Sequence, residues 1–522
     1  MPQPSRFIAC SGRRATLTAV SVLNRASPSS TVLPDAAFAL RPSACPGLLR
    51  IVAARDGGIC RIKLPGGELS AAQAHAIADV STRHAAGVIE LTNRANLQLR
   101  GVRGGEEAAL IAALVDAGLG PLAEASTSSE EKADTRSSAA LTASAADDIR
   151  NVMISPAAGR DPSALFDTRP LCTTLLALLQ SDARFAALSP KFALLVDGGE
   201  RLARLDHPHD VWLAASQDGS GEIRFMFGLA GCPPVAATNS ATIDAGALAA
   251  VLPSQVPALV RALLHTFLDL AADSDTTRMR HLLAEHSADA ILRHAQTYVD
   301  FPLARDAALA EWQRSTPADA TLRVGAHAQR IAGTWHVGGQ PLLGRIDATA
   351  LHGLASLARQ HANGALRITP WQSVLLPDIA THAVPAVLTA LKTLGFACDL
   401  DDPASRLIAC AGSTGCAKSL ADTKADALAL AKRLPAGVDV HLSGCPRSCA
   451  AAHCAPFTLL AAAPGLYDLY RRDAQPGFGE CVARRLTIAQ AADTLAQLAQ
   501  AGQTHAQDAR PECPTQMSDT DA

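Results

Sequence analysis

Two short cysteine pairs constrain this chain more than any other feature. Cys410 and Cys416 are separated by five residues, Cys445 and Cys449 by three, and both pairs lie in segments rich in Gly, Ser, Thr and Pro. Between the pairs, apolar residues recur at helical spacing over 420–434 and then alternate as in a strand over 438–442. Such a crossover makes its two strands parallel neighbours, so both pairs should reach the carboxyl edge of one sheet.

Four converging thiols predict a site for a soft metal. Sulfur ligands in a set of four suit zinc or an iron–sulfur cluster. Structural zinc sites usually use cysteines two residues apart, so the wider spacings here favour a [4Fe–4S] cluster. Zinc and buried cysteines without a metal remain the alternatives. Cys454 could substitute as a ligand or serve as a small buried apolar residue.

Length and composition exclude several classes of protein. A chain of 522 residues should form about three to four domains. Its net charge of −3 gives nucleic-acid binding no electrostatic support, and no apolar run approaches the roughly 20 residues of a membrane span. The 13 cysteines are an odd number spread along the chain, unlike a disulfide scaffold, so we expect a reducing, cytoplasmic location.

The chain contains two internal repeats. Residues 77–92 match 354–369 without a gap, and the preceding Ser70 and Asp347 are both good helix caps. A fainter repeat relates the β-α-β pattern of 150–196 to that of 407–442. Two small units therefore alternate in the order A-B-A′-B′, which predicts a pseudo-twofold assembly with a seam suited to a large flat ligand.

The cysteine pairs, with Gly444 before the second, resemble the cluster-binding half of the sirohaem sulfite and nitrite reductase superfamily. Within it, the segments 409–412 and 443–446 most resemble the branch that acts in aerobic cobalamin biosynthesis. The resemblance implies an α+β fold with a duplicated nitrite/sulfite reductase-like architecture. Two ferredoxin-like half-domains and two α/β domains would be related by pseudo-twofold symmetry.

The resemblance and the repeats together predict the domain boundaries. They are a disordered leader (1–40), half-domain 1 (41–121), a flexible linker (122–147), a substrate-binding α/β domain 1 (148–300), half-domain 2 (301–385), α/β domain 2 with the cluster (386–500) and a disordered tail (501–522). Arg13 and Arg14 in the leader faintly resemble a twin-arginine export signal.

Three segments resemble the superfamily's sirohaem and anion contacts. They supply the candidate substrate-binding residues Arg94, Gln98, Arg150, Asn151 and Lys191. Cationic side chains suit a tetrapyrrole precursor because it carries eight carboxylates. The reductases have a second lysine where this chain has Ala193, which removes a charge that would help to hold a small oxyanion.

The leading hypothesis is an iron–sulfur monooxygenase of that cobalamin branch. The resemblance implies hydroxylation of precorrin-3A at C20 with O2, γ-lactone formation, a [4Fe–4S] cluster on the four cysteines and a mononuclear non-haem iron. No Gly-x-Gly-x-x-Gly follows a strand, so electrons should come from a separate NADH-oxidising donor. The alternatives are a sirohaem-dependent sulfite or nitrite reductase and a redox-sensing tetrapyrrole binder without turnover.

No catalytic residue emerges from the spacing alone. His207, His209 and Asp210 form a group that could hold a mononuclear iron, but a polar turn is the favoured interpretation of this segment.

Overall fold

The computed structural model describes residues 45–121, 144–235, 246–272, 274–303, 307–451, 455–473 and 477–508. The expected leader, Cys454 and most of the expected linker and tail lie outside these ranges. Where the ends of those two segments are described, they are helical. Residues 144–149 form a helix, and helix α13 (Ile488–Asp508) continues past residue 500.

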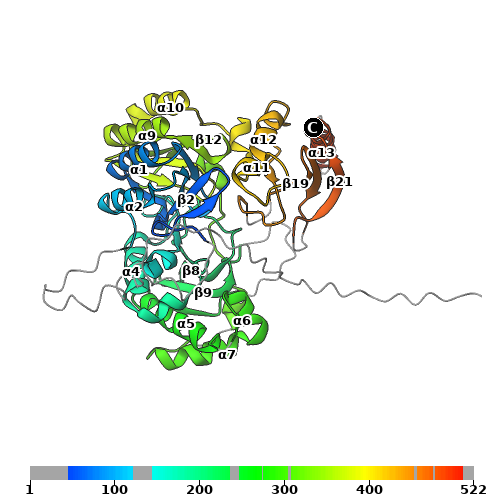
Figure 1. The fold of residues 1–522 in the computed structure, drawn as a ribbon. Helices are drawn as coiled ribbons and strands as arrows, with labels where there is room; N and C mark the ends of the chain where they lie inside the picture. The colour runs from blue at the N-terminus through cyan, green and yellow to red at the C-terminus, as the bar shows by residue number, and fades with distance from the viewer. Residues whose placement is uncertain are drawn as a thin grey trace, which may run out of the picture.

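The two half-domains form two antiparallel sheets covered by paired helices (Figure 1). Sheet order is β1-β2-β5-β4-β13 in the first and β11-β12-β15-β14-β3 in the second, with β16 also paired to β12. The first half-domain supplies β1 (Val52–Ala54), β2 (Gly57–Ile62), β3 (Glu68–Ser70), β4 (Val88–Leu91), β5 (Leu97–Val102), α1 (Ala71–His84) and α2 (Glu107–Asp116). The second supplies β11 (Gly325–Ala328), β12 (Thr334–Pro341), β13 (Arg345–Asp347), β14 (Ala365–Ile368), β15 (Val374–Ala380), β16 (Phe396–Ala397), α9 (Ala348–His361) and α10 (Val384–Thr393).

Each half-domain gives one strand to the sheet of the other. β3 pairs with β14, and β13 pairs with β4, so the exchange is reciprocal. The helices that follow these strands, α1 and α9, pack side by side and share one continuous apolar core. Both predicted caps are confirmed, because the Ser70 side chain accepts from Gln73 N and Asp347 from Ala350 N. The half-domains therefore form one structural body.

The two α/β domains share one topology. Each sheet has two parallel pairs followed by two antiparallel pairs, in the orders β6-β7-β8-β9-β10 and β17-β18-β19-β20-β21. The first contains β6 (Val152–Ile154), β7 (Leu194–Asp197), β8 (His209–Gln217), β9 (Ile223–Gly231) and β10 (Ala249–Val251), with α4 (Arg169–Ser181), α5 (Val256–Leu270), α6 (Met279–Glu285) and α7 (Ala288–Ala295). The second contains β17 (Leu407–Ala409), β18 (Val440–Ser443), β19 (Phe457–Ala463), β20 (Leu466–Arg471) and β21 (Glu480–Leu486), with α11 (Gly412–Gly415), α12 (Thr423–Ala431) and α13.

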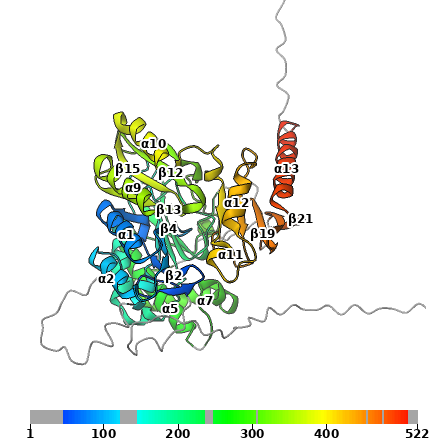
Figure 2. The ribbon, with the colours of Figure 1, turned by 45° about the horizontal axis from the view of Figure 1, so that its top comes forward.

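This arrangement confirms the predicted duplicated α+β architecture. The A-B-A′-B′ order places α/β domain 1 below the joined half-domains and α/β domain 2 beside them, as the two views in Figures 1 and 2 show. The boundary expected at residue 385 falls inside α10, and the half-domain sheet extends to β16. None of the helices in the described ranges is long and apolar enough to cross a membrane.

A buried ion pair stabilises the end of β7. The Arg314 guanidinium donates to both carboxylate oxygens of Asp197, at 2.6 and 3.0 Å, and both side chains are only 1 % exposed. The fully buried Glu200 lies beside this pair, with one oxygen accepting from Gly198 N at 2.9 Å. Burial, followed by the charge of Asp197, raises the pKa of Glu200 to about 8.

Glu200 should therefore make the stability of this domain depend on pH. The folded protein keeps a proton on Glu200 that the unfolded chain releases near pH 4.5, so this group's contribution to stability falls as pH rises from about 4.5 to about 8. In Glu200→Gln, thermal unfolding should show a weaker pH dependence in that window and a higher midpoint above pH 8. Glu222→Gln, at an exposed position, is the control. Identical pH profiles for wild type and Glu200→Gln would contradict this assignment.

Candidate metal centre and adjoining pocket

The four predicted cysteines lie at the carboxyl edge of the second α/β sheet. β17 and β18 are parallel neighbours, as predicted; Cys410 follows directly after β17, and Cys445 lies two residues after the end of β18. Cys410, Cys416 and Cys445 are partly buried, and Cys449 is exposed. Burial raises the pKa of the Cys449 thiol, and the nearby charges of Cys445, Cys410 and Cys416 raise it further. The thiols of Cys410, Cys416 and Cys445 therefore lie close enough to Cys449 to interact with it electrostatically.

The loop around Cys410 is built to hold a thiolate. The backbone N–H of Gly444 donates to Cys410 Sγ at 3.2 Å, and the Thr423 hydroxyl lies 3.3 Å from the same sulfur. The Thr423 hydroxyl donates to the Cys410 carbonyl at 3.0 Å, so the Gly444 N–H is the donor that fixes the sulfur. A side chain at 444 would place its Cβ 1.8 Å from Ser419 Oγ, so the close approach of the two loops requires glycine there.

The chemistry of the four thiols favours an iron–sulfur cluster. Among the described residues, no group of three or more His, Cys, Asp or Glu side chains is placed to hold one metal ion. Zinc would need its sulfurs within about 2.3 Å of one point, whereas in a [4Fe–4S] cubane each cysteine binds a different iron. Four cysteine sulfurs are the ligands that a cubane takes, so the chemistry of the donor set fits a [4Fe–4S] cluster.

Charged side chains from the first half-domain and from helix α12 lie close to this site. The Arg100 guanidinium forms two hydrogen bonds with Asp56, at 2.7 and 2.8 Å, and donates to the Gly415 carbonyl at 2.9 Å. Lys424 on α12 donates to the carbonyls of Leu343 and Ala409, at 3.0 and 3.2 Å. Burial lowers the pKa of Lys424 to about 8, although the charge of Glu90 opposes this.

Gln98 belongs to this charged cluster. Its amide accepts from Arg61 Nη2 at 2.9 Å and donates to Glu90 Oε2 at 3.2 Å. The structure therefore places Gln98 among the charged groups near the cysteines and not among the residues that line the pocket described next.

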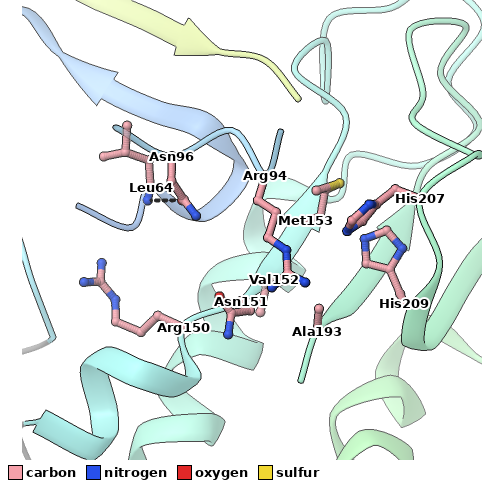
Figure 3. Close-up of a pocket in the computed structure, with 10 residues that line it drawn as sticks. All are labelled: Leu64, Arg94, Asn96, Arg150, Asn151, Val152, Met153, Ala193, His207 and His209. Atoms are coloured by element: carbon pink, nitrogen blue, oxygen red, sulfur yellow. Dashed lines mark hydrogen bonds between the residues drawn. The ribbon is translucent and has the colours of Figure 1, made fainter. Parts of the chain in front are cut away.

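A pocket lies between the first half-domain and α/β domain 1 (Figure 3). It is lined by Leu64, Arg94, Asn96, Arg150, Asn151, Val152, Met153, Ala193, His207 and His209. Three of the predicted substrate-binding residues, Arg94, Arg150 and Asn151, therefore come together here. Lys191 is exposed and is not among the lining residues.

Arg94 is the cation best placed in this pocket. It follows β4, in a turn where Asn96 Oδ1 accepts from Leu64 N at 2.8 Å. Burial, together with the charges of Arg278 and Arg61, lowers the pKa of Arg94 to about 10, so it stays protonated near neutral pH. A partly buried guanidinium close to other cations attracts an anion.

Arg150 and Asn151 have partners within the protein. Arg150 lies 3.8 Å from the buried Asp147, and in Figure 3 its side chain extends away from the two histidines. The Asn151 amide nitrogen donates to the carbonyls of Asp148, Pro190 and Phe192, at 3.0 to 3.1 Å. Asn151 therefore joins the start of β6 to the segment before β7 and shapes the wall of the pocket.

Two histidines line the pocket where a polar turn was expected. His207 and His209 are 3 % and 1 % exposed, with ring centroids 5.3 Å apart, so the polar-turn interpretation is wrong. Within the described residues, neither ring nitrogen of His209 forms a regular hydrogen bond. Burial, followed by the charges of Arg94 and Arg278, lowers the pKa of His209 to about 3, so the imidazole is neutral. The signal in the sequence that could have revealed this burial is the apolar run that follows His209 in strand β8 (His209–Gln217).

Asp210 serves a different purpose. Its carboxylate accepts from Arg278 Nε at 2.9 Å and from the backbone N–H groups of Met279 and Ala193, at 2.8 and 2.9 Å. It therefore anchors α6 against β8.

Family models match both kinds of domain. The nitrite and sulphite reductase 4Fe-4S domain matches residues 145–303, and the nitrite/sulfite reductase ferredoxin-like half domain matches 53–117 and 327–394. Together these matches cover more than half of the chain, which belongs to the nitrite and sulfite reductase superfamily and is an enzyme of that superfamily. The family supports an iron–sulfur cluster, although the four cysteines lie in the second α/β domain, outside the matched residues.

Individual relatives fall into two functional groups. The chain is 29% identical to the ferredoxin–nitrite reductase of Synechococcus elongatus over 422 residues, which cover 77% of this chain and 76% of the relative. It is 27% identical to a precorrin-3B synthase of Sinorhizobium sp over 432 residues, 82% of each chain. The fold matches the NirA protein of Mycobacterium tuberculosis with a TM-score of 0.65 at 20% identity, over 85% of this chain and 80% of that one.

Proposed function

We propose that the chain is a precorrin-3B synthase. In this reaction precorrin-3A and O2, with two electrons from NADH delivered by a separate donor, give precorrin-3B and water. C20 of the macrocycle gains a hydroxyl group, and an acetate side chain closes a γ-lactone. The proposal agrees with the precorrin-3B synthase relative, which matches along 82% of the chain.

The charge of the pocket is the observation that carries the proposal. At the position of the reductases' second lysine stands Ala193, which lines the pocket, and Lys191 is exposed outside it. The neighbouring strand contributes His209, which is neutral because its pKa is about 3. Reduction of a small oxyanion needs a dense set of cations and proton donors. Arg94 and Arg150 still line the pocket, but with alanine at 193 and a neutral His209 it suits O2 and a macrocycle with carboxylate side chains better than a small oxyanion.

The residues fit the expected cofactors in different degrees. Cys410, Cys416, Cys445 and Cys449 would hold the [4Fe–4S] cluster, which supplies electrons one at a time. His207 and His209 are our candidates for holding the mononuclear non-haem iron, since both rings are buried in the pocket and imidazole is a common ligand for iron. Asp210 is committed to Arg278 and is not proposed as a third ligand.

The protein's own groups would bind and orient the substrate. Arg94 would pair with a carboxylate of precorrin-3A, because its guanidinium is partly buried, charged and directed into the pocket. Asp147 would hold Arg150 at the rim, and Asn151 would keep the wall between β6 and β7 rigid. Because His207 and His209 are buried, water would be kept away from their ring nitrogens.

A sirohaem-dependent nitrite or sulfite reductase is the second candidate. It is favoured by the exposure of Cys449, because a bridging thiolate needs space on its outer side for the haem iron. It is also favoured by the nitrite reductase relatives, which match with similar identity. Under this alternative, the chain would use sirohaem together with the cluster.

One experiment separates these candidates. Protein purified without oxygen would be examined for a sirohaem absorption band and then mixed with precorrin-3A, a reductant and air. We expect no sirohaem band and a product heavier than precorrin-3A by one oxygen atom, measured by mass spectrometry. A sirohaem band with consumption of nitrite or sulfite would establish the second candidate instead. Bound but unchanged precorrin-3A would indicate a tetrapyrrole binder without turnover.

A further inference from the structure

Two buried cations donate to the carbonyl groups that directly precede two of the cysteines. Lys424 Nζ donates to the carbonyl of Ala409, before Cys410, and Arg100 Nη2 donates to that of Gly415, before Cys416. The two cations come from separate domains, since Arg100 lies on β5 and Lys424 on α12. Each also interacts electrostatically with its neighbouring thiol.

Glu90 is the anion that these cations share. Its carboxylate lies 3.5 Å from Arg100, 3.8 Å from Lys424 and 2.6 Å from Arg345. Burial acts to raise the pKa of Glu90, but these three cations outweigh it and lower the pKa below its usual value. Arg100 has Asp56 as a second partner, so three cations face two carboxylates. The cluster of charges carries a net positive charge beside the cysteine loops.

Fixed charges at such positions act on a redox centre. Reduction adds a negative charge to an iron–sulfur cluster, and a buried cation stabilises that charge more than one in water does because the local dielectric is low. A buried anion has the opposite effect. Neither Arg100 nor Lys424 can contact a metal in place of a thiolate, because both are cations.

We propose that Lys424 and Arg100 are positioning residues that raise the reduction potential of the cluster, and that Glu90 lowers it. This inference rests on the proposed placement of a [4Fe–4S] cluster on the four cysteines. It assigns the first half-domain a role in the redox chemistry of the second α/β domain. The contributions of Arg100 and Glu90 to the potential therefore depend on the contact between the two domains.

The test compares variants of opposite charge. Lys424→Met and Glu90→Gln would be purified anaerobically as full chains, and cluster potentials would be measured at pH 7 by redox titration followed by EPR. We expect Lys424→Met to lower the potential and Glu90→Gln to raise it, each by about tenfold in the reduction equilibrium, or about 59 mV for one electron. Lys432→Met removes the same charge from an exposed position near the end of α12 and should leave the potential unchanged.

The outcomes are distinguishable. Shifts of both variants in the same direction would indicate a loosened loop and would overturn the proposal, as would equal potentials for Lys424→Met and Lys432→Met. If Lys424→Met lost its cluster, Glu90→Gln alone would decide, and an unshifted or lowered potential in that variant would overturn the proposal. Absence of iron and acid-labile sulfide from the wild type would instead refute the cluster placement.

Discussion

Serine at position 445 should remove the iron–sulfur cluster. We expect Cys445→Ser, purified without oxygen, to contain less than about one tenth of the iron and acid-labile sulfide of the wild type. The reason is that a serine oxygen binds iron poorly in place of a thiolate. The loop itself should persist, since serine is similar in size and the Cys445 carbonyl still accepts from Ser443 Oγ at 2.8 Å. The measurement is chemical analysis of iron and sulfide together with the visible absorption of the cluster.

Two other cysteines provide matched controls. Cys398 and Cys481 are also partly buried, but they lie after β16 and on β21, away from the ends of β17 and β18. Cys398→Ser and Cys481→Ser should retain wild-type iron and sulfide. Equal metal content in all three variants would show that the cysteine loops do not hold the cluster.

Loss of Arg314 should destabilise the first α/β domain by about 3–5 kcal/mol, because its removal leaves the carboxylate of Asp197 buried without a counter-ion. The change Arg314→Met keeps much of the volume while removing every hydrogen bond to Asp197 and to the Glu200 carbonyl. Urea unfolding followed by tryptophan fluorescence measures the effect, since Trp212 is buried on β8 of the same sheet.

Two further variants show whether burial causes the effect. Arg433 pairs with Asp493 at 2.6 Å on the surface, where the side chains are 48 % and 61 % exposed, so Arg433→Met should change the free energy of unfolding by less than about 1 kcal/mol. The double variant Arg314→Met with Asp197→Leu should be more stable than Arg314→Met alone, because it removes the buried charge. A double variant that is less stable would contradict this explanation.

The Arg314–Asp197 pair shows how the duplicated domains differ. β7 and β18 occupy equivalent positions in sheets of the same topology. β7 ends at Asp197, which pairs with Arg314, whereas β18 ends at Ser443, just before the second cysteine pair. The first domain thus stabilises its strand ends with an ion pair, and the second presents thiols there.

Local patterns in the sequence predicted much of this fold. The caps Ser70 and Asp347 each depend on residues within one helical turn, and the parallel strands β17 and β18 follow from a short crossover. The exchange of β3 and β13 was not predicted, because these strands have three residues each and their partners lie more than 250 residues away. Such pairings depend on the assembled core and not on local propensity.

Predictions for the pocket were less complete for the same reason. His207 and His209 flank a proline and resemble a surface turn, yet both side chains are buried. Lys191 was expected in the pocket but is exposed, while Gln98 lies among the charges near the cysteines. The burial of the histidines and the exposure of Lys191 depend on tertiary packing, which a single sequence does not reveal.

The reciprocal strand exchange also affects how the protein is made. When β4 leaves the ribosome, the edge that β13 will occupy is open, and β13 is encoded about 250 residues later. At about 5–20 residues per second, the nascent chain would expose that edge for roughly ten to fifty seconds. An open strand edge pairs readily with other chains, so molecular chaperones would have most to protect during this interval of translation.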